Sequence, residues 1–485
     1  MKTVYTNFRI VDAERDVEGA LVVEDGLIKT IIPAEQAEST DESAAESRQL
    51  LFELAGAGRF IDGAKLKDPA SRELPVILPS FIDLHAHFRD PGTPALGVLL
   101  KETLESASLA AVKGGYTTLV CMANTNPVID TLAAAAALKA RSDALGLIDL
   151  YPAMSLTKGM EGRALSEIAE LASLRHVGGS RGNGVAEPPA SSPPLALRGL
   201  RHPPQRGTTP RHPLDAPPPK PGAGLMPCVL MLSEDGKDVA DDDLLVKAFR
   251  AAAQAGVPVS CHCDRDGENA ATARVLRLAQ ETGARVHIAH VSTKEAVAMV
   301  AAAKRECPGQ ITAEATPHHF FLTDKRADEL GRDTFGKVAP PLRSEADREA
   351  VLEALLEGPL HGIDAIATDH APHTDADKEA GAPGFSGLET AFAVAGTAIV
   401  SSGESDLCHL SRLLSATPAR ILGLDDRGTL ESGKRADLVI VNPDTRWTVD
   451  RAVFRSRGKN TPFDGWELSG LVLATILGGN IVYER

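Results

Sequence analysis

The sequence predicts an α/β protein, with a (β/α)8, TIM-like barrel and a small β-sandwich domain formed by the two ends of the chain. From about residue 76 to 420, short apolar strands alternate with Ala-rich helical stretches, and histidines and aspartates cluster where the strands end. Segments rich in β-branched residues lie at both ends of the sequence. In a parallel barrel the carboxyl ends of all strands converge on one face, so residues distant in the sequence can share one pocket.

The barrel strands are expected at short apolar runs that end in polar residues. These runs are 75–87, 115–125, 256–264, 285–292, 311–319 and 364–373, and the helical stretches between them include 244–256 and 270–283. The strands of the β domain are expected in residues 1–32, 428–449 and 471–484, where alternating or β-branched runs are broken by turn residues. We therefore expect residues 1–75 and 425–485 to form the small β domain and residues 76–424 to form the barrel.

Residues 174–227 interrupt this alternation of strands and helices. They hold 13 of the 32 prolines and almost no acidic residues, a composition that cannot form a packed core. We interpret the segment as a disordered insertion within the barrel, with an out-of-frame stretch of GC-rich coding sequence as the open alternative. A floppy segment cannot hold a metal geometry, so three histidines are not expected to be ligands: His176, His202 and His212.

Composition excludes several classes of protein. The formal net charge of −15 argues against a surface for nucleic acid or anionic membranes, because binding phosphate needs clustered Lys and Arg. The six cysteines are sparse and lack the CxxC pairs of a structural zinc site, which favours free thiols in the cytoplasm. No run approaches the roughly 18 apolar residues of a membrane helix, and the N-terminus lacks the apolar core of a signal peptide. We therefore expect neither a nucleic acid nor a membrane as a partner.

The strongest chemical signal is the motif DLHAH at residues 83–87, which ends an apolar run. Alternation along a strand puts His85 and His87 on one face, where two neutral imidazoles can bind one divalent ion. His262 and His290 each close a later predicted strand, and the four histidines together suit a two-metal hydrolase. By the same alternation, three neighbouring residues should face away from the site: Cys261, Cys263 and His287.

Two carboxylates complete the metal-binding set that the sequence predicts. Asp369, in the segment IATDHAPH, could bind a metal and take a proton from water, and it is our candidate general base. His373, a short turn further along, could contact an anionic substrate. A carboxylate between two cations remains ionised, which suits either Asp235 or Glu234 in LSEDGK as a bridging ligand. The residues alone leave that choice open.

The ordered motifs resemble those of the bacterial type I dihydroorotases, in the amidohydrolase superfamily of cyclic amidohydrolases. The motifs are FIDLHAHFRDPG, MANTNPVID, LSEDGK, HCD, HVST, KVAPPLR, TDHAPHT and PGFSGLET. The resemblance implies a zinc-dependent hydrolase of pyrimidine biosynthesis that interconverts dihydroorotate and N-carbamoyl-L-aspartate. It also implies two zinc ions bridged by Asp235, one of them held by His85, His87 and Asp369 and the other by His262 and His290.

The same resemblance implies a set of substrate contacts. They are His87, Arg89, Asn124 and His373, together with the backbone at Pro383 and Gly384. Arg89 suits a substrate carboxylate because its planar guanidinium can donate two parallel hydrogen bonds. Ala339 departs from the pattern, since many relatives carry an asparagine there that helps to bind the pyrimidine ring. We therefore expect one substrate hydrogen bond to be missing.

Two alternative functions are weighed against this one. Another cyclic amidase, such as a dihydropyrimidinase, hydantoinase or allantoinase, would prefer uncharged rings and have no use for Arg89. Many such relatives bridge their metals with a carbamylated lysine, whereas this chain has Asp235. A non-catalytic subunit that scaffolds aspartate transcarbamoylase would lack the metal ligands that are retained here. The resemblance leaves a homodimer and a complex with aspartate transcarbamoylase open as partners beyond the small-molecule substrate.

Overall fold

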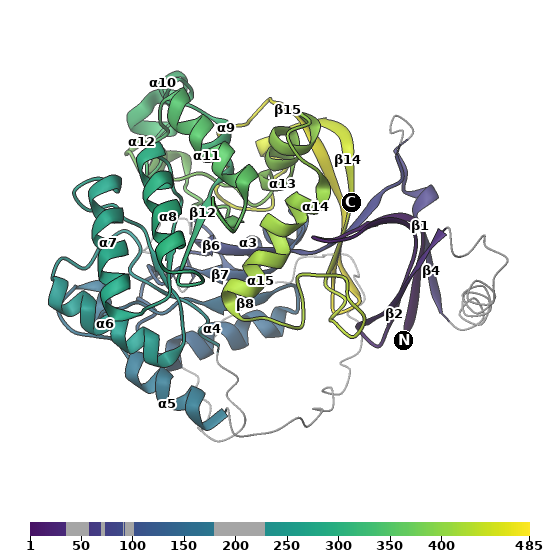
Figure 1. Cartoon of the computed structure of the whole chain (residues 1–485). Coiled ribbons are helices and arrows are strands. Elements are labelled where there is room, and N and C mark those ends of the chain that lie inside the picture. The colour runs from purple at the N-terminus through teal and green to yellow at the C-terminus, as the bar shows by residue number, and fades with distance from the viewer. Residues whose placement is uncertain (35–57, 69–72, 91, 93–100, 179–227) are drawn as a thin grey trace, which may run out of the picture.

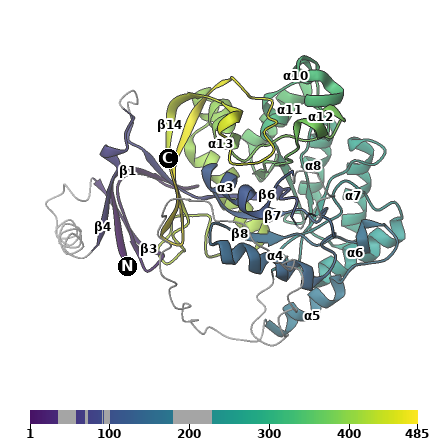
Figure 2. The same ribbon diagram turned by 180° about the vertical axis from the view of Figure 1, so that it is seen from behind.

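A parallel β-barrel and a mixed β-sheet pack side by side in the computed structural model of the chain (Figure 1). The structure describes residues 1–34, 58–68, 73–90, 92, 101–178 and 228–485. Figure 2 shows the N-terminal and C-terminal strands together on the side of the molecule away from helices α6 and α7. The two ends of the chain therefore meet in one sheet, as the sequence predicts.

Eight parallel strands form the barrel within the described residues. They are β6 (Phe81–Ala86), β7 (Tyr116–Cys121), β8 (Asp149–Pro152), β9 (Leu232–Ser233), β10 (Val259–Cys261), β11 (Val286–Ile288), β12 (Ile311–Ala315) and β13 (Ala365–Ile366). Strands β6 to β8 pair in order, and so do β9 to β13. Two parallel bridges, Met154 with Leu232 and Ala86 with His370, join these sets into a ring. The predicted (β/α)8 barrel is confirmed.

Helices alternate with the barrel strands and cover their outer side (Figure 1). The longer ones are α3 (Leu104–Lys113), α4 (Leu132–Leu145), α5 (Ile168–Gly178), α6 (Asp242–Ala255), α7 (Glu268–Thr282), α8 (Lys294–Glu306) and α11 (Glu345–Glu357). The shorter ones are α9 (Pro317–Phe321), α10 (Asp324–Leu330), α12 (Asp375–Glu379), α13 (Ala391–Ala395), α14 (Leu407–Ser411) and α15 (Thr417–Leu422). No described helix is long and apolar enough to cross a membrane.

The mixed sheet has the order β16-β15-β14-β5-β1-β2-β3, with β4 also paired to β1. Its strands are β1 (Lys2–Val11), β2 (Asp16–Glu24), β3 (Leu27–Pro33), β4 (Arg59–Asp62), β5 (Val76–Pro79), β14 (Leu438–Thr448), β15 (Glu467–Leu477) and β16 (Asn480–Glu484). Side chains from both ends of the chain share one core, in which Tyr5 and Leu21 pack with Leu438 and Ile476. This shared core makes the N- and C-terminal segments one folding unit.

The run 75–87, expected as one barrel strand, is divided into two strands. Residues of β5 pair with β1 and β14 in the mixed sheet, and only β6 enters the barrel. The division falls at Ser80, whose N–H donates to the carbonyl of Asp437. The run 311–319 also ends early as a strand, because Pro317 has the fixed φ that suits the first turn of α9.

Most of the predicted insertion, residues 179–227, lies outside the described residues, and so do residues 35–57. Residues 174–178 continue helix α5. The boundaries of the two predicted domains therefore stay a prediction, although the sheet and the barrel are both present.

A buried group of charges joins the barrel to the sheet. Arg427 donates from Nη1 to Asp149 Oδ2 at 2.6 Å and to Thr118 Oγ1 at 2.9 Å, both on barrel strands. The same nitrogen lies 3.6 Å from Asp437, next to β14. Arg435 pairs with both of these aspartates. The junction thus depends on cations that neutralise carboxylates in a site largely closed to water.

We expect Arg427→Met to lower the free energy of unfolding by about 3 kcal/mol, because it leaves buried carboxylates short of a partner. Urea denaturation measures the change. Arg446→Met is the matched control. Arg446 forms an ion pair with Glu467 at the surface, and its own side chain is 73% exposed. Its effect should stay within about 0.5 kcal/mol. Equal losses in the two variants would contradict this account of the junction.

Candidate metal centre and active site

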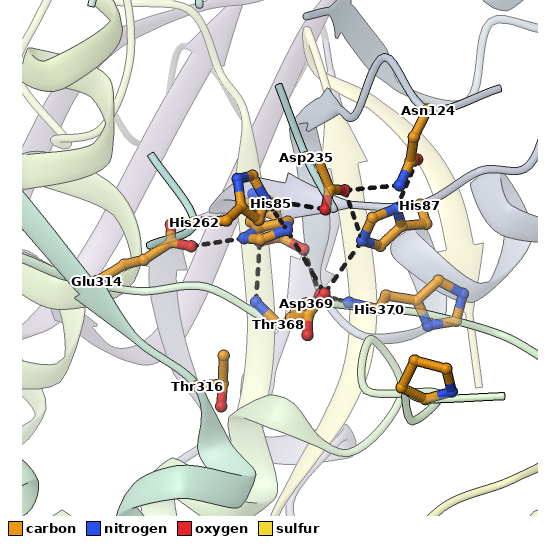
Figure 3. A network of polar contacts seen from close by, with 12 residues as sticks. His85, His87, Asn124, Asp235, His262, Glu314, Thr316, Thr368, Asp369 and His370 are labelled. Atoms are coloured by element: carbon orange, nitrogen blue, oxygen red, sulfur yellow. Dashed lines mark hydrogen bonds and ion pairs between the residues drawn. The ribbon is translucent and has the colours of Figure 1, made fainter. Parts of the chain in front are cut away.

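Six predicted ligands come together at the carboxyl ends of the barrel strands, and all six are buried. Each lies at or just after the end of a strand: His85 and His87 at β6, Asp235 after β9, His262 after β10, His290 after β11 and Asp369 after β13. Figure 3 shows five of them in one network of polar contacts. The barrel therefore brings together residues that lie up to 284 positions apart in the sequence.

Short distances connect the imidazoles and carboxylates of this cluster. His87 Nε2 lies 3.2 Å from Asp369 Oδ1 and 3.3 Å from Asp235 Oδ2. The other oxygen of Asp235, Oδ1, lies 3.3 Å from His262 Nε2. His85 Nε2 is 3.2 Å from His262 Nε2 and 3.5 Å from Asp369 Oδ1. The two oxygens of Asp235 thus face different histidines.

These donors fit a divalent cation. Two groups of three have ligand atoms within 4.8 Å of one another, His85 with His262 and His290, and His85 with His87 and Asp235. His85 belongs to both groups. Imidazole nitrogens and carboxylate oxygens are the ordinary ligands of zinc and related ions. The Nδ1 atoms of His262 and His290 have no protein partner among the described residues.

The two carboxylates of the cluster are held in the ionised form. Burial raises the pKa of Asp369, but the charge of His85 and the hydrogen bond from His87 outweigh it and hold that pKa well below its usual value. The pKa of Asp235 is lowered against burial in the same way, chiefly by His262. Burial holds the pKa of His290 well below its usual value, with help from His262. Burial lowers the pKa of His85, but the charges of Asp369 and Glu314 outweigh it and raise that pKa to about 10. Because metals bind ionised carboxylates and neutral imidazole, a cation at this site would displace the proton of His85.

The backbone is strained where it carries these side chains. Arg89, His290 and Asp369 have φ angles of 53°, 34° and 44°, a region that residues other than glycine seldom adopt. Each costs about 1–3 kcal/mol and persists only when the surrounding structure fixes it. Such strain clusters at functional sites.

The predicted substrate residues lie beside the metal ligands. His373 is central to them: its Nε2 donates to the carbonyl of Pro383 at 2.8 Å and lies 3.5 Å from Arg89 Nη2. Arg89 Nε is buried without a partner among the described residues. Asn124 instead contacts two ligands, with Oδ1 3.0 Å from His87 Nδ1 and Nδ2 donating to Asp235 at 2.9 Å.

Known proteins match this chain along most of its length. The chain matches the model of the Amidohydrolase family over residues 231–482 and the Dihydro-orotase-like model over residues 75–180. Dihydroorotases from Clostridium botulinum and Syntrophus aciditrophicus are 32% and 34% identical to it, each over 100% of both chains. Another, from Caldanaerobacter subterraneus, is 38% identical over 84% of this chain and 86% of its own. The chain belongs to the dihydroorotase family.

Solved structures with the same fold include hydantoinases and dihydropyrimidinases. An L-hydantoinase (dihydropyrimidinase) from Arthrobacter aurescens matches with a TM-score of 0.73 at 24% identity, over 100% of this chain and 96% of its own. A dihydropyrimidinase from Brevibacillus agri matches with a TM-score of 0.72 at 18% identity, over 100% and 95%. These likenesses establish the shared architecture of this dihydroorotase-family chain.

A buried carboxylate that the sequence did not single out supports His85. Glu314 Oε1 lies 2.7 Å from His85 Nδ1, and its Oε2 lies 2.9 Å from His287 Nε2. His287 Nδ1 is in turn 2.8 Å from Thr312 Oγ1. A carboxylate on Nδ1 fixes the tautomer that turns Nε2 toward a metal. The sequence did contain a signal for Glu314, because it is the single acidic residue within the short strand ITAEA.

His287 was expected to face away from the site, and that expectation is wrong. It shares Glu314 with His85, so its side chain lies below the cluster within the barrel. The positive φ of His290 breaks the alternation on which the expectation rested. Cys261 and Cys263 do lie in the hydrophobic core, as predicted.

Glu234 and Ala339 take no part in the cluster of this dihydroorotase-family site. Glu234 accepts hydrogen bonds from the N–H groups of Leu156 and Thr157 at 2.8 and 3.0 Å, and so holds the loop after β8. Asp235 is therefore the carboxylate of LSEDGK that faces the histidines. Ala339 is exposed and offers no polar side-chain atom to a substrate.

We expect Glu314→Gln to weaken the binding of a divalent metal such as zinc by about tenfold to a hundredfold, because the neutral amide no longer strengthens His85 as a ligand. Competition with a chromophoric chelator measures the affinity. Asp364→Asn is the control for loss of a nearby buried carboxylate, since Asp364 pairs with Lys304 and accepts from the N–H of Ala313 but contacts none of the six candidate ligands. A Glu314 variant with unchanged affinity would remove this carboxylate from the metal site.

Proposed function

We propose that the chain is a dihydroorotase, which opens the ring of dihydroorotate to N-carbamoyl-L-aspartate and closes it again in pyrimidine biosynthesis. The observation that carries the proposal is the position of Arg89 beside the six-ligand cluster, in a chain of the dihydroorotase family. A guanidinium there offers a partner for the ring carboxylate that dihydroorotate carries and uncharged cyclic amides lack. The whole chain has a formal charge of −15, so an anionic substrate needs a positively charged side chain such as Arg89 within the site itself.

We further propose that two zinc ions occupy the cluster, bridged by Asp235. His85, His87 and Asp369 would hold one ion, and His262 and His290 the other. The separation of the two Asp235 oxygens supports this assignment, since one faces His87 and the other His262. When bound, zinc would polarise the ring amide carbonyl and lower the pKa of water to about 7.

The side chains of the site have separate tasks in this proposal. Asp369 accepts the proton of the attacking water and delivers it to the ring nitrogen that leaves, and the reverse transfer accompanies ring closure. Arg89, Asn124 and His373 bind the substrate carboxylate, for which Asn124 and His373 exchange their contacts with Asp235 and the Pro383 carbonyl. The backbone at Pro383 and Gly384 contacts the ring. A homodimer, a complex with aspartate transcarbamoylase and a cytoplasmic location stay predictions from the resemblance.

The experiment that tests the function is hydrolysis of L-dihydroorotate by zinc-loaded protein, followed by the loss of ultraviolet absorbance. Dihydrouracil and hydantoin serve as competing substrates. We expect turnover of dihydroorotate, little turnover of the uncharged rings, and loss of activity on chelation that added zinc restores. Preference for an uncharged ring would instead favour a dihydropyrimidinase, and zinc-loaded protein without turnover would favour a scaffolding subunit.

We expect Asp369→Asn to lower kcat for dihydroorotate by about a thousandfold or more, because the amide cannot accept the proton. Zinc analysis of the same preparation should still find metal held by the remaining histidines. Asp364→Asn again serves as a control for loss of a buried carboxylate. A near-normal rate in the Asp369 variant would rule out its role as the base.

A further inference from the structure

Lys378 is a buried lysine that the proposed mechanism does not use. It lies in α12 and its side chain is 0% exposed. Its ammonium donates to three backbone carbonyls, those of Lys337 at 2.7 Å, Ala382 at 2.9 Å and Gly384 at 3.0 Å. Three donors thus meet three acceptors, and none of these acceptors is a carboxylate.

Holding this ammonium in the interior is costly. Burial lowers the pKa of Lys378 to about 8, and the charge of Lys337 adds to the effect. A buried charge needs compensation, and here the described contacts supply only carbonyl dipoles and the ring of Phe385, whose centroid is 5.3 Å away. An apolar side chain would avoid that cost. The buried ammonium is therefore explained by its hold on the three carbonyls and not by any gain in stability from burying it.

The three carbonyls belong to two loops at the substrate side of the site. Lys337 precedes the segment VAPPLR, whereas Ala382 and Gly384 follow α12. The N–H of Gly384 also donates to the carbonyl of Lys337 at 3.0 Å. Asn460, from the C-terminal part of the chain, donates to the Gly384 carbonyl at 2.7 Å. Lys378 thus fastens the two loops to each other around Gly384.

The backbone at Gly384 has little room to move. Its φ of 129° is one that residues with a side chain rarely adopt. A Cβ atom at this position would lie 2.5 Å from the Cβ of Ala371 and 2.9 Å from its carbonyl oxygen. The preceding carbonyl, that of Pro383, accepts from His373. The segment therefore has a defined position against His373, which Lys378 secures from the other side.

We propose that Lys378 is a positioning residue, whose ammonium fixes the backbone of Pro383 and Gly384 in the place where it contacts the substrate ring, and so sets substrate affinity. The proposal rests on the proposed function, because the substrate contact of that backbone is part of it. Lys378 touches neither the substrate nor the metal ligands, and it acts through the loop.

The test compares Lys378→Met with the wild type in steady-state hydrolysis of dihydroorotate. We expect KM to rise about tenfold or more while kcat changes less than about threefold, since the lost interaction orients the substrate and leaves the reacting groups in place. Zinc content should be unchanged. A variant whose KM equals that of the wild type would overturn the proposal.

Lys304→Met is the matched control. Lys304 is also a buried lysine, and its ammonium donates to the carbonyls of Pro359 at 3.1 Å and Gly362 at 2.6 Å while pairing with Asp364. It lies at the amino ends of the barrel strands, away from the site. We expect lower stability and an unchanged KM. An equal rise of KM in both variants would show a general loss of stability and contradict the positioning role.

Hydrogen exchange separates this proposal from the proposed function. Amides of residues 382–387 should exchange faster in Lys378→Met than in the wild type, whether or not dihydroorotate is turned over. Wild-type protein without turnover would defeat the function alone, and unchanged exchange would defeat the positioning role alone. If Lys378→Met does not fold, Lys378→Arg keeps the buried charge, and its larger guanidinium should displace the loop and raise KM in the same direction.

Discussion

The closure of the barrel between β6 and the segment after β13 is the contact on which the site depends. The N–H of His87 donates to the carbonyl of His370 at 2.8 Å, and the carboxylate of Asp83 accepts from the N–H and hydroxyl of Thr368 at 3.0 and 2.5 Å. These bonds bring Asp369 within 3.2 Å of His87, although 282 residues separate them. The hydrogen bonds that close the barrel therefore also position His87 and Asp369 in the candidate metal centre.

A layer of buried polar residues beneath the ligands makes this arrangement rigid. Glu314 has both oxygens occupied, by His85 and by His287, and Thr312 occupies the remaining nitrogen of His287. A polar network inside a protein is stable only when every member has a partner, and a satisfied network specifies one geometry. His85 is consequently held from below while its Nε2 faces the cluster. The strain at His290 and Asp369 can persist because the strands around them are fixed in this way.

The sequence predicted the barrel, and the six residues that gather at its strand ends, because both follow from local pattern. Apolar runs that end in His or Asp mark strand ends, and a parallel barrel brings every strand end to one face. Contacts between residues on distant elements leave no such pattern in the sequence. Pairing of β5 with β14 could not be read from the run 75–87, since β5 and the first residues of β6 are alike apolar. Lys378 has the sequence context of an ordinary exposed helix residue, and it is the loops at Lys337 and at 382–385 that enclose its ammonium.

The site has two parts that are built by different means. The proposed metal ligands lie at strand ends, whose positions the barrel ladder fixes. The substrate side is formed by loops, which have no ladder and must be held by individual contacts. Asn460 accepts from the N–H of His373 at 3.1 Å and donates to the carbonyl of Gly384, so the C-terminal segment completes that side of the site. Because this segment returns to the mixed sheet through β15, the sheet helps to position the proposed substrate side of the site. In the proposed function, the strands therefore position the residues that act on the substrate, and the loops position the residues that recognise it.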